Sequence, residues 1–439
     1  MNNVYDFGAK GDGITLDTAA IQRAIDAGGM VNFPPGKYLT GTLYLKSYGG
    51  LHLEQGAMLM ASGDPADYNA DDFCEQNRPR YHEEASGAHL IVGVEVTHVT
   101  ISGDGIIDGN RKAFQHTPLP SGKYEVDKWR PSQMIYFVES DHINIRDVEL
   151  NNAPYWTCFI HGCEDVTIYG VKIFTEWRTR NGDGIDIDCS RRVTISDCII
   201  DTGDDCITLR ADLQQLKNQD RPCEDITVTN CILKTCCNAI RVGVGSGIIR
   251  KAVLGNLVIR ETRTGICVVS KYGAYAGVNI HDVKFHDIIM QCKRPFLVQS
   301  SIRGPLDAEE QFLSDIEFSN ISGSANRSSL IQGNPGYPVK RINFNNINLV
   351  YSGGEDIVEA DYYTEFKNPC APEAFHIENA ENVSFDKLRI DWNNASDKFK
   401  HTIYAAKSSN IVCNNVESEH SIYIKKGDKN ETETILYAD

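Results

Sequence analysis

One short pattern recurs along most of the chain: alternating apolar residues, then Asn, Asp or Gly, then a second apolar run. Its first four copies read VTISGDGII, INIRDVEL, VTIYGVKI and VTISDCII. Alternation with a period of two predicts a short β-strand, and Asn, Asp and Gly tolerate the left-handed conformation of a tight corner. The central residues of the copies are Ile101, Ile145, Ile168, Ile195, Val228, Leu254, Phe285, Phe318, Phe344, Phe385 and Cys413.

The spacing of the copies indicates how they stack. Successive central residues are 23 to 44 positions apart, and no copy has a helical pattern. Irregular steps above a fixed minimum are typical of a solenoid with loop insertions. A β-sandwich would need tight two-residue turns such as Asn-Gly, which are scarce here. The sequence therefore predicts an all-β fold, a parallel β-helix. Three insertions could wall a cleft: 61–87, 110–129 and 211–222.

The first 40 residues differ from the coils. Residues 17–26 have the spacing of a short amphipathic helix, with Asp17 as its N-cap. A solenoid needs its end coil covered, because open strand edges aggregate, so this helix is the expected cap. We expect one domain over 1–439, with a cap region at 1–40, coils from about 90 to 420 and a C-terminal tail that closes the other end. The predicted apolar face of the helix is Ala20, Ile21, Ala24 and Ile25.

The amino-acid composition limits the classes of molecule that this protein can bind. The chain has 43 Lys and Arg against 60 Asp and Glu, a net charge of -17. This balance argues against nucleic acid and against an anionic membrane, but an acidic protein can still bind an anionic sugar polymer in a locally basic cleft. No apolar run reaches the roughly 18 residues that span a membrane, and the N-terminus lacks a signal-peptide pattern. The expected location is cytoplasmic, or periplasmic or secreted after signal removal.

The fourteen cysteines do not form paired CxxC motifs, so no zinc site is expected. Most lie inside apolar stretches and should be small buried hydrophobes. So many free thiols favour a reducing compartment.

Two acidic segments stand apart from the repeats. NGDGIDID (181–188) carries Asp183, and DTGDDCIT (201–208) carries Asp204 and Asp205. Asp183 and Asp204 are 21 positions apart, close to the shortest coil, so the three carboxylates should lie on neighbouring coils. Carboxylates this close repel, and one should have a raised pKa. Glycoside hydrolysis needs such a set, with one carboxylic acid to protonate the leaving oxygen and carboxylates to activate water.

Two other interpretations of these acids compete with catalysis. Asp residues at coil corners often cap turns, as expected for Asp197, Asp225 and Asp282, and carboxylate oxygens could instead hold calcium. Converging acids without a nearby cation would destabilise the fold unless function required them. Glycines beside the acids should let the backbone bend and a sugar approach closely; they are Gly182, Gly184 and Gly203.

These residues carry a family resemblance. VYDFGAKGDGITLDTAAIQRAID, NAPYWT, NGDGIDID and DTGDDCI resemble, in order and spacing over nearly the whole chain, the motifs of glycoside hydrolase family 28, the polygalacturonase family. The resemblance implies a right-handed parallel β-helix, inverting hydrolysis and no metal or organic cofactor. It also implies that Asp204 is the general acid and that Asp183 and Asp205 hold and activate the water.

The chain departs from the family at two motifs. The family has Gly-His-Gly one coil after the second acidic segment, and Asn238 stands here where that His is expected. The family's Arg-Ile-Lys, whose cations hold a galacturonate carboxylate, becomes a stretch with Cys267 and Val269 at the cation positions. A carboxylate without a cationic partner binds poorly, so either Arg241 and Lys271 replace those cations or the sugar is not a galacturonate.

The predicted function is an inverting glycoside hydrolase of a pectin-type acidic polysaccharide or oligosaccharide that contains galacturonate or rhamnose. Insertion 110–129 could close one end of the cleft, which favours chain-end cutting. Two alternatives stay open: a β-helix that binds polysaccharide without cutting it, and a calcium-dependent lyase in which Lys271 or Arg241 abstracts a proton. Expected substrate contacts are Asn181, Arg180, Asn238, Arg241, Lys271, Trp177 and Tyr272, with Tyr155 and Trp156 as further aromatic candidates.

Overall fold

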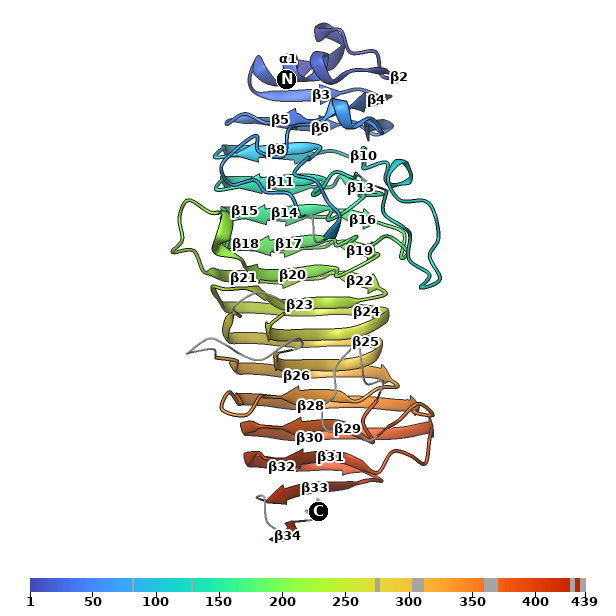
Figure 1. Ribbon diagram of the computed structural model, residues 1–439, viewed down its shortest axis with the longest axis vertical. Helices are drawn as coiled ribbons and strands as arrows, with labels where there is room; N and C mark the ends of the chain where they lie inside the picture. The colour runs from blue at the N-terminus through green and yellow to red at the C-terminus, as the bar shows by residue number, and fades with distance from the viewer. Residues whose placement is uncertain are drawn as a thin grey trace. The chain divides into compact units, whose positions relative to one another are not determined.

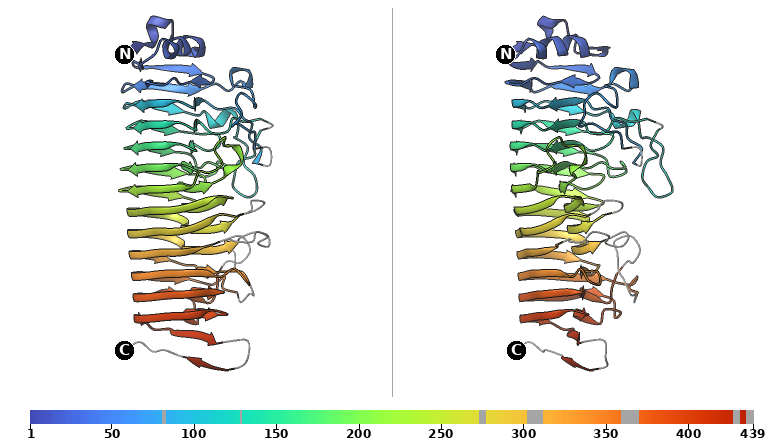
Figure 2. Two further views of the ribbon diagram at one scale, coloured as in Figure 1. Left: turned by 90° about the vertical axis from the view of Figure 1, so that its left-hand side faces the viewer. Right: turned by 60° about the vertical axis from the view of Figure 1, so that its left-hand side comes forward.

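The computed structural model describes residues 1–80, 83–127, 129–272, 277–301, 312–358, 370–426 and 431–434. The chain divides into two compact units, 1–208 with 212–236 and 209–211 with 237–439. Each unit is a stack of coils made from parallel β-strands (Figures 1 and 2). The predicted parallel β-helix is therefore confirmed in each unit, whereas the single domain stays a prediction.

Three parallel sheets build the coils of the first unit. Its N-terminal elements are β1 (Asn2–Asn3), β2 (Asp12–Leu16), α1 (Thr18–Asp26), β3 (Met30–Phe33), β4 (Gly36–Thr40), β5 (Leu43–Tyr44), β6 (Gly49–Leu53) and β7 (Ala57–Ala61). One sheet then stacks β8 (Ile91–Val94), β11 (Ile135–Val138), β14 (Cys158–His161) and β17 (Ile185–Asp188). A second stacks β9 (Thr97–Ser102), β12 (Asp141–Arg146), β15 (Glu164–Tyr169), β18 (Arg191–Ser196) and β21 (Cys223–Thr229). A third stacks β10 (Ile106–Asp108), β13 (Glu149–Asn151), β16 (Lys172–Phe174), β19 (Ile199–Thr202) and β22 (Ile232–Thr235).

The central residues of the repeat are register partners in the first unit. Ile101, Ile145, Ile168, Ile195 and Val228 pair in that order from strand to strand, and all are buried. The corners that follow are left-handed at Asp147, Asp197 and Asn230, with φ of 68°, 58° and 57°. Asn and Asp accept this conformation at low cost. Asp225 and Asp282 have φ of 56° and 55°, so the three acids expected at corners lie there.

Helix α1 lies at the N-terminal end of the first unit (Figure 1). Its four predicted apolar residues are all buried, as an end cap requires. Asp17 occupies the N-cap position but makes no capping bond. Its carboxylate instead accepts backbone N–H bonds from Lys10 at 2.8 Å and Gly11 at 2.9 Å, so it holds the preceding loop rather than the helix.

Longer strands that bend through corners build the second unit. They are β23 (Asn238–Gly245), β24 (Ile248–Lys271), β25 (Asn279–Ser301), β26 (Ser314–Ala325), β27 (Ser329–Gln332), β28 (Val339–Gly353), β29 (Glu373–Glu378), β30 (Ala380–Ala395), β31 (His401–Ala406), β32 (Ser409–Ser418), β33 (Ser421–Lys426) and β34 (Glu431–Thr434). The predicted central residues are again register partners, from Leu254 through Phe285, Phe318, Phe344 and Phe385 to Cys413. In the predicted tail, β33 continues the parallel stack and β34 pairs with it antiparallel.

A column of phenylalanines fills the core of the second unit. The rings of Phe318 and Phe344 stack at 4.8 Å between centroids, as do those of Phe344 and Phe385. Phe296 and Phe375 approach the column edge-on or tilted from the opposite sheet. Offset and edge contacts of this kind stabilise beyond the area they bury.

We expect Phe344→Ala to destabilise the protein by about 3–5 kcal/mol, because the cavity would remove two stacked partners at once. Ile289→Ala is the control, since Ile289 lies on β25 of the same unit with its side chain 63% exposed. Urea unfolding should show a large shift of the midpoint for the first variant and little for the second. Equal shifts would show that the column does not hold this unit together.

All fourteen cysteines are free thiols and ten are buried, which confirms most of them as small hydrophobes. Within the ranges described, no helix has the length and apolar character needed to cross a membrane.

Candidate active site

The two acidic segments lie side by side in the first unit. The Gly182 carbonyl accepts from the Asp204 N–H at 3.2 Å, and the Gly184 N–H donates to the Asp205 carbonyl at 2.9 Å. These backbone bonds put Asp183 on the coil next to the Asp204–Asp205 pair. The predicted proximity of the three acids is therefore confirmed.

The electrostatics of this cluster centre on Asp183. Asp183 and Asp205 are only 7% and 4% exposed, whereas Asp204 is half-buried. Asp183 Oδ1 is buried and has no hydrogen-bond partner among the described residues. Burial raises the pKa of Asp183 well above its usual value, and repulsion from Asp204, Asp186, Asp205 and Glu83 raises this pKa further.

A raised pKa favours the protonated form of Asp183. The resemblance to family 28 instead gives the transferable proton to Asp204. Both assignments supply one neutral carboxyl beside ionised ones, which is the pairing that glycoside hydrolysis uses. They differ in which carboxyl protonates the leaving oxygen, and a substrate with an activated leaving group distinguishes them.

The three glycines beside the acids have a different role from the one expected. A Cβ on Gly184 would lie 2.4 Å from the Cys206 carbonyl oxygen, and one on Gly203 would lie 2.6 Å from that of Thr179. A Cβ on Gly182 would meet threonine side chains at 3.0 Å. The neighbouring chain fills these spaces, so the glycines permit close packing of coils rather than the approach of a sugar.

Arg130 organises the segment before Asp183, and the sequence pattern gave no sign of it. Its guanidinium is completely buried and donates to the Arg180 carbonyl at 2.8 Å, the Pro154 carbonyl at 2.9 Å and Asn181 Oδ1 at 2.9 Å. It also lies 4.8 Å over the ring of Tyr155. Burial lowers the pKa of Arg130 to about 10, so the side chain stays charged at neutral pH. Arg130, which directly follows insertion 110–129, thus holds the predicted contact residue Asn181 in place.

We expect Arg130→Met to cost about 3 kcal/mol or more, because it would remove all the hydrogen bonds that a buried guanidinium makes to the carbonyls of Glu83, Glu84, Pro154 and Arg180 and to Asn181 Oδ1. Loosening of the segment before Asp183 should also lower kcat by about 10- to 100-fold. Arg146→Met is the matched control, because Arg146 is exposed and pairs with its neighbour Asp147. A normal thermal midpoint with full activity would contradict this role.

The other predicted contacts of the first unit are partly engaged by protein. Arg180 pairs with Glu84 at 2.7 Å, and a substrate carboxylate would have to compete with that ion pair. Trp177 is 48% exposed and carries the Arg178 guanidinium 5.2 Å from its ring centroid. Tyr155 and Trp156 are buried, so their rings do not offer a surface to a sugar.

Insertion 110–129 docks beside the acids. Residues Pro118 and Tyr124 form an antiparallel bridge, and Lys123 between them extends toward the acidic coils. Lys123 Nζ donates to the Trp177 carbonyl at 2.9 Å and to the Gly203 carbonyl, directly before Asp204, at 2.5 Å. The insertion therefore forms a side wall along the acidic segments.

The remaining predicted contacts lie in the second unit. Asn238 is completely buried, and Arg241 and Lys271 are nearly so. The Arg241 guanidinium lies 4.2 Å over the ring of Tyr272. The structure thus brings Arg241 and Tyr272 into contact with each other.

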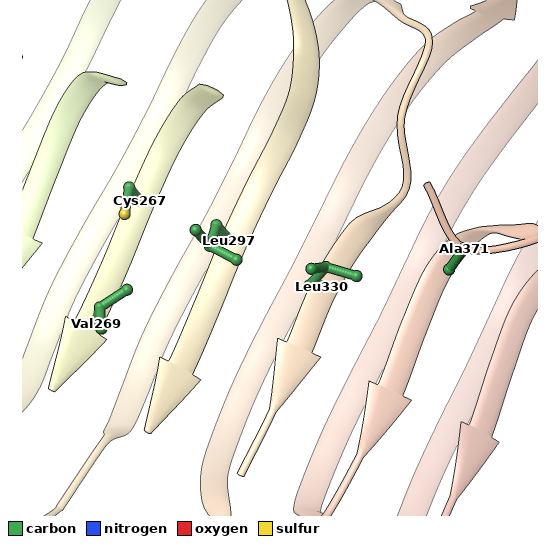
Figure 3. Close-up of a cluster of buried hydrophobic side chains, with 5 residues drawn as sticks. All are labelled: Cys267, Val269, Leu297, Leu330 and Ala371. Carbon is green, nitrogen blue, oxygen red and sulfur yellow. The ribbon is translucent and has the colours of Figure 1, made fainter. Parts of the chain in front are cut away.

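An apolar cluster occupies the two positions where the family has cations (Figure 3). Phe296 contacts the phenylalanine column inside the coil, and side chains alternate along a strand, so Leu297 points to the opposite, outer face. Cys267 is in register with Leu297, and Leu297 with Leu330. Tyr272 packs against this cluster, whose members are all 0% exposed: Cys267, Val269, Leu297, Leu330 and Ala371.

Among the described residues of the first unit, two groups offer clustered metal-ligand atoms. One is exposed and comprises His98, Asp141 and His142; the other is buried and comprises His161, Asp188 and Cys189. His161 Nε2 bonds the Asp212 carbonyl at 2.9 Å, which fixes its ring against the coil.

The fold and the acidic cluster define a parallel β-helix with a carboxylate-rich site. The chain belongs to the glycosyl hydrolases family 28, whose family model matches residues 72–372. A second family model, described as rhamnogalacturonase A/epimerase, pectate lyase-like, matches residues 1–53.

Individual relatives are more distant. A probable polygalacturonase of Vitis vinifera is 32% identical over 48% of this chain and 44% of its own length. An exo-poly-alpha-D-galacturonosidase of Dickeya chrysanthemi is 27% identical over 66% of this chain and 55% of its own. The chain thus spans about half the length of these relatives. A family 28 exopolygalacturonase structure from Yersinia enterocolitica aligns with a TM-score of 0.67 and 22% identity, covering 95% of this chain and 78% of that one, which supports the predicted right-handed β-helix.

Proposed function

We propose that this chain is an inverting glycoside hydrolase that acts on a pectin-type acidic polysaccharide or oligosaccharide containing galacturonate or rhamnose. The observation that carries the proposal is the crowding of Asp183, Asp204 and Asp205, with the raised pKa of Asp183. Buried acids that repel one another cost stability, and such arrangements cluster at catalytic sites. Relatives named as polygalacturonase and exo-poly-alpha-D-galacturonosidase support the substrate class.

In this proposal the half-buried Asp204 protonates the leaving oxygen. Asp205 and Asp183 hold the water that attacks the opposite face of the sugar, and no metal or organic cofactor takes part. Proton transfer by positioned carboxyls supplies typically about 10²- to 10⁴-fold of the acceleration.

Recognition of the sugar is proposed for residues that replace the family's cations. Cys267 and Val269 offer no charge, so a galacturonate beside the cut would depend on Arg241 and Lys271, and a rhamnose there would need neither. The further proposed contacts are Asn181, Arg180, Asn238, Trp177 and Tyr272.

A hydrolysis panel tests the proposal. It comprises homogalacturonan, rhamnogalacturonan, branched pectin fragments and aryl glycosides of galacturonate and rhamnose, with products resolved by chromatography. Release by the wild type with inverted anomeric configuration, and not by Asp204→Asn, would support it. Unsaturated, ultraviolet-absorbing products that disappear with chelator would identify a lyase instead. Binding without any release would favour a binding protein.

A further inference from the structure

A row of outward side chains leads to the acids along the first sheet of the first unit. Val92 of β8, Tyr136 of β11 and Phe159 of β14 are register partners in turn, and Phe159 pairs with Asp186 of β17. The alternate residues of these strands, such as Phe137, face the core. A sugar chain lying along the coils past the acids would have to cross this row.

Residues 62–80 and 83–90 cover this row. Val92, Tyr136 and Phe159 are each at most 2% exposed although they point away from the core. The ring of His89 stacks on Tyr136 at 4.2 Å, and the Tyr136 hydroxyl donates to the Gln76 carbonyl at 3.3 Å. Figure 2 shows the blue and cyan loops of this unit gathered on one side of the strands.

The end of this cover nearest the acids carries two charged side chains. The Arg80 guanidinium lies 4.6 Å over the ring of Trp156 and 5.8 Å over that of Phe159. Backbone hydrogen bonds join Arg80 to Ala85, and the Glu83 N–H donates to the Arg80 carbonyl at 2.9 Å.

Glu83 is fixed in place beside the acidic cluster. Its carboxylate accepts a hydrogen bond from the buried Tyr155 hydroxyl, and its carbonyl accepts from Arg130 Nη2 at 2.6 Å. Its charge contributes to the raised pKa of Asp183, so the carboxylate lies within electrostatic range of the acids. A half-buried, immobilised carboxylate at this position can accept hydrogen bonds from sugar hydroxyls, and it would repel a uronate carboxylate.

We propose that residues 62–80 and 83–90 end the substrate cleft one strand before the acids, so that the first bound sugar is a chain terminus held by Glu83 and Arg80. This inference rests on the proposed function and names its substrate more closely: chain ends rather than internal bonds. Sequence analysis favoured chain-end cutting because of insertion 110–129. In the structure insertion 110–129 forms a side wall of the cleft. Residues 62–80 and 83–90, from the insertion that precedes it in the sequence, close the end of the cleft instead.

Analysis of the wild-type products tests directly whether the cleft is closed at this end. On the polymers of the panel, we expect one product size from the first minutes, with viscosity falling in proportion to released sugar. A ladder of lengths with an early collapse of viscosity would overturn the inference while leaving the hydrolase intact. No release from any polymer would overturn the hydrolase and the inference with it.

Glu83→Gln and Arg80→Met test the terminal-sugar contacts. Loss of one charged hydrogen bond should raise KM for short oligosaccharides by about 10- to 100-fold and weaken inhibition by the released sugar to the same extent. Glu75→Gln is the control from the same segment, since Glu75 is 82% exposed, and its kinetics should match the wild type. The Gln variant preserves shape, so an unchanged KM and inhibition constant in a folded Glu83→Gln protein would overturn the assigned contact.

Discussion

Asp204→Asn should lower kcat by about 10²- to 10⁴-fold on a polysaccharide with little change in thermal midpoint. The side chain is half-buried beside the deeper Asp183 and Asp205, so it is the carboxyl best placed to reach a leaving oxygen. The amide keeps the shape and removes the transferable proton. Asp197→Asn is the matched control, because Asp197 is an exposed corner residue with φ of 58°, a conformation that Asn also accepts.

Comparing substrates with different leaving groups shows whether Asp204 is the general acid. A nitrophenolate needs no protonation to depart, so an aryl glycoside should recover most of the activity that Asp204→Asn loses on the polymer. Recovery in Asp204→Asn and not in Asp183→Asn would assign the proton to Asp204. The reverse pattern would assign it to Asp183, whose raised pKa makes it the other candidate.

The repeat was readable in the sequence because a solenoid makes long-range contacts nearly local. Every coil buries the same strand position, so an apolar residue at a fixed place in each copy predicts its register partner one copy away. Ile145 and Ile168 are such a pair. The proximity of Asp183 to Asp204 followed from the same logic, since both motifs lie in coils of nearly minimal length.

The contacts of residues in and beside the insertions cannot be predicted in this way, because these segments have no repeating register. Arg130 and Lys123 bond the acidic segments, and Glu83 raises the pKa of Asp183, from positions that no periodicity encodes. Each pairs with backbone atoms or with residues far away in sequence, so composition gives no signal. Sequence comparison did locate the family's two replaced cations at Cys267 and Val269, but only the structure shows that these side chains join a buried apolar cluster.

Asp183→Asn should make the protein more stable at neutral pH while removing its activity. The carboxyl is buried, one of its oxygens has no hydrogen-bond partner among the described residues, and its acidic neighbours repel it. A carboxyl whose folded pKa is raised costs about 1.4 kcal/mol of stability for each pH unit between its unfolded pKa and its folded pKa or the working pH, whichever is lower, and Asn carries no such cost. A variant that gains stability as it loses catalysis indicates a site kept at the expense of folding.

The pH dependence of that gain gives the sharper test, because the raised pKa of Asp183 fixes its sign. Near and below about pH 4, the usual carboxyl pKa of an unfolded chain, Asp183 is protonated in both states and costs nothing. Above that pH the unfolded state releases the proton and the folded state keeps it, so stability falls by about 1.4 kcal/mol per pH unit until the folded pKa is passed. Thermal midpoints of Asp183→Asn and wild type should therefore converge at pH 4 and separate toward pH 7, with the variant higher. A gap that is constant with pH, or one that favours the wild type at pH 7, would mean that Asp183 is ionised in the folded protein and would contradict its raised pKa.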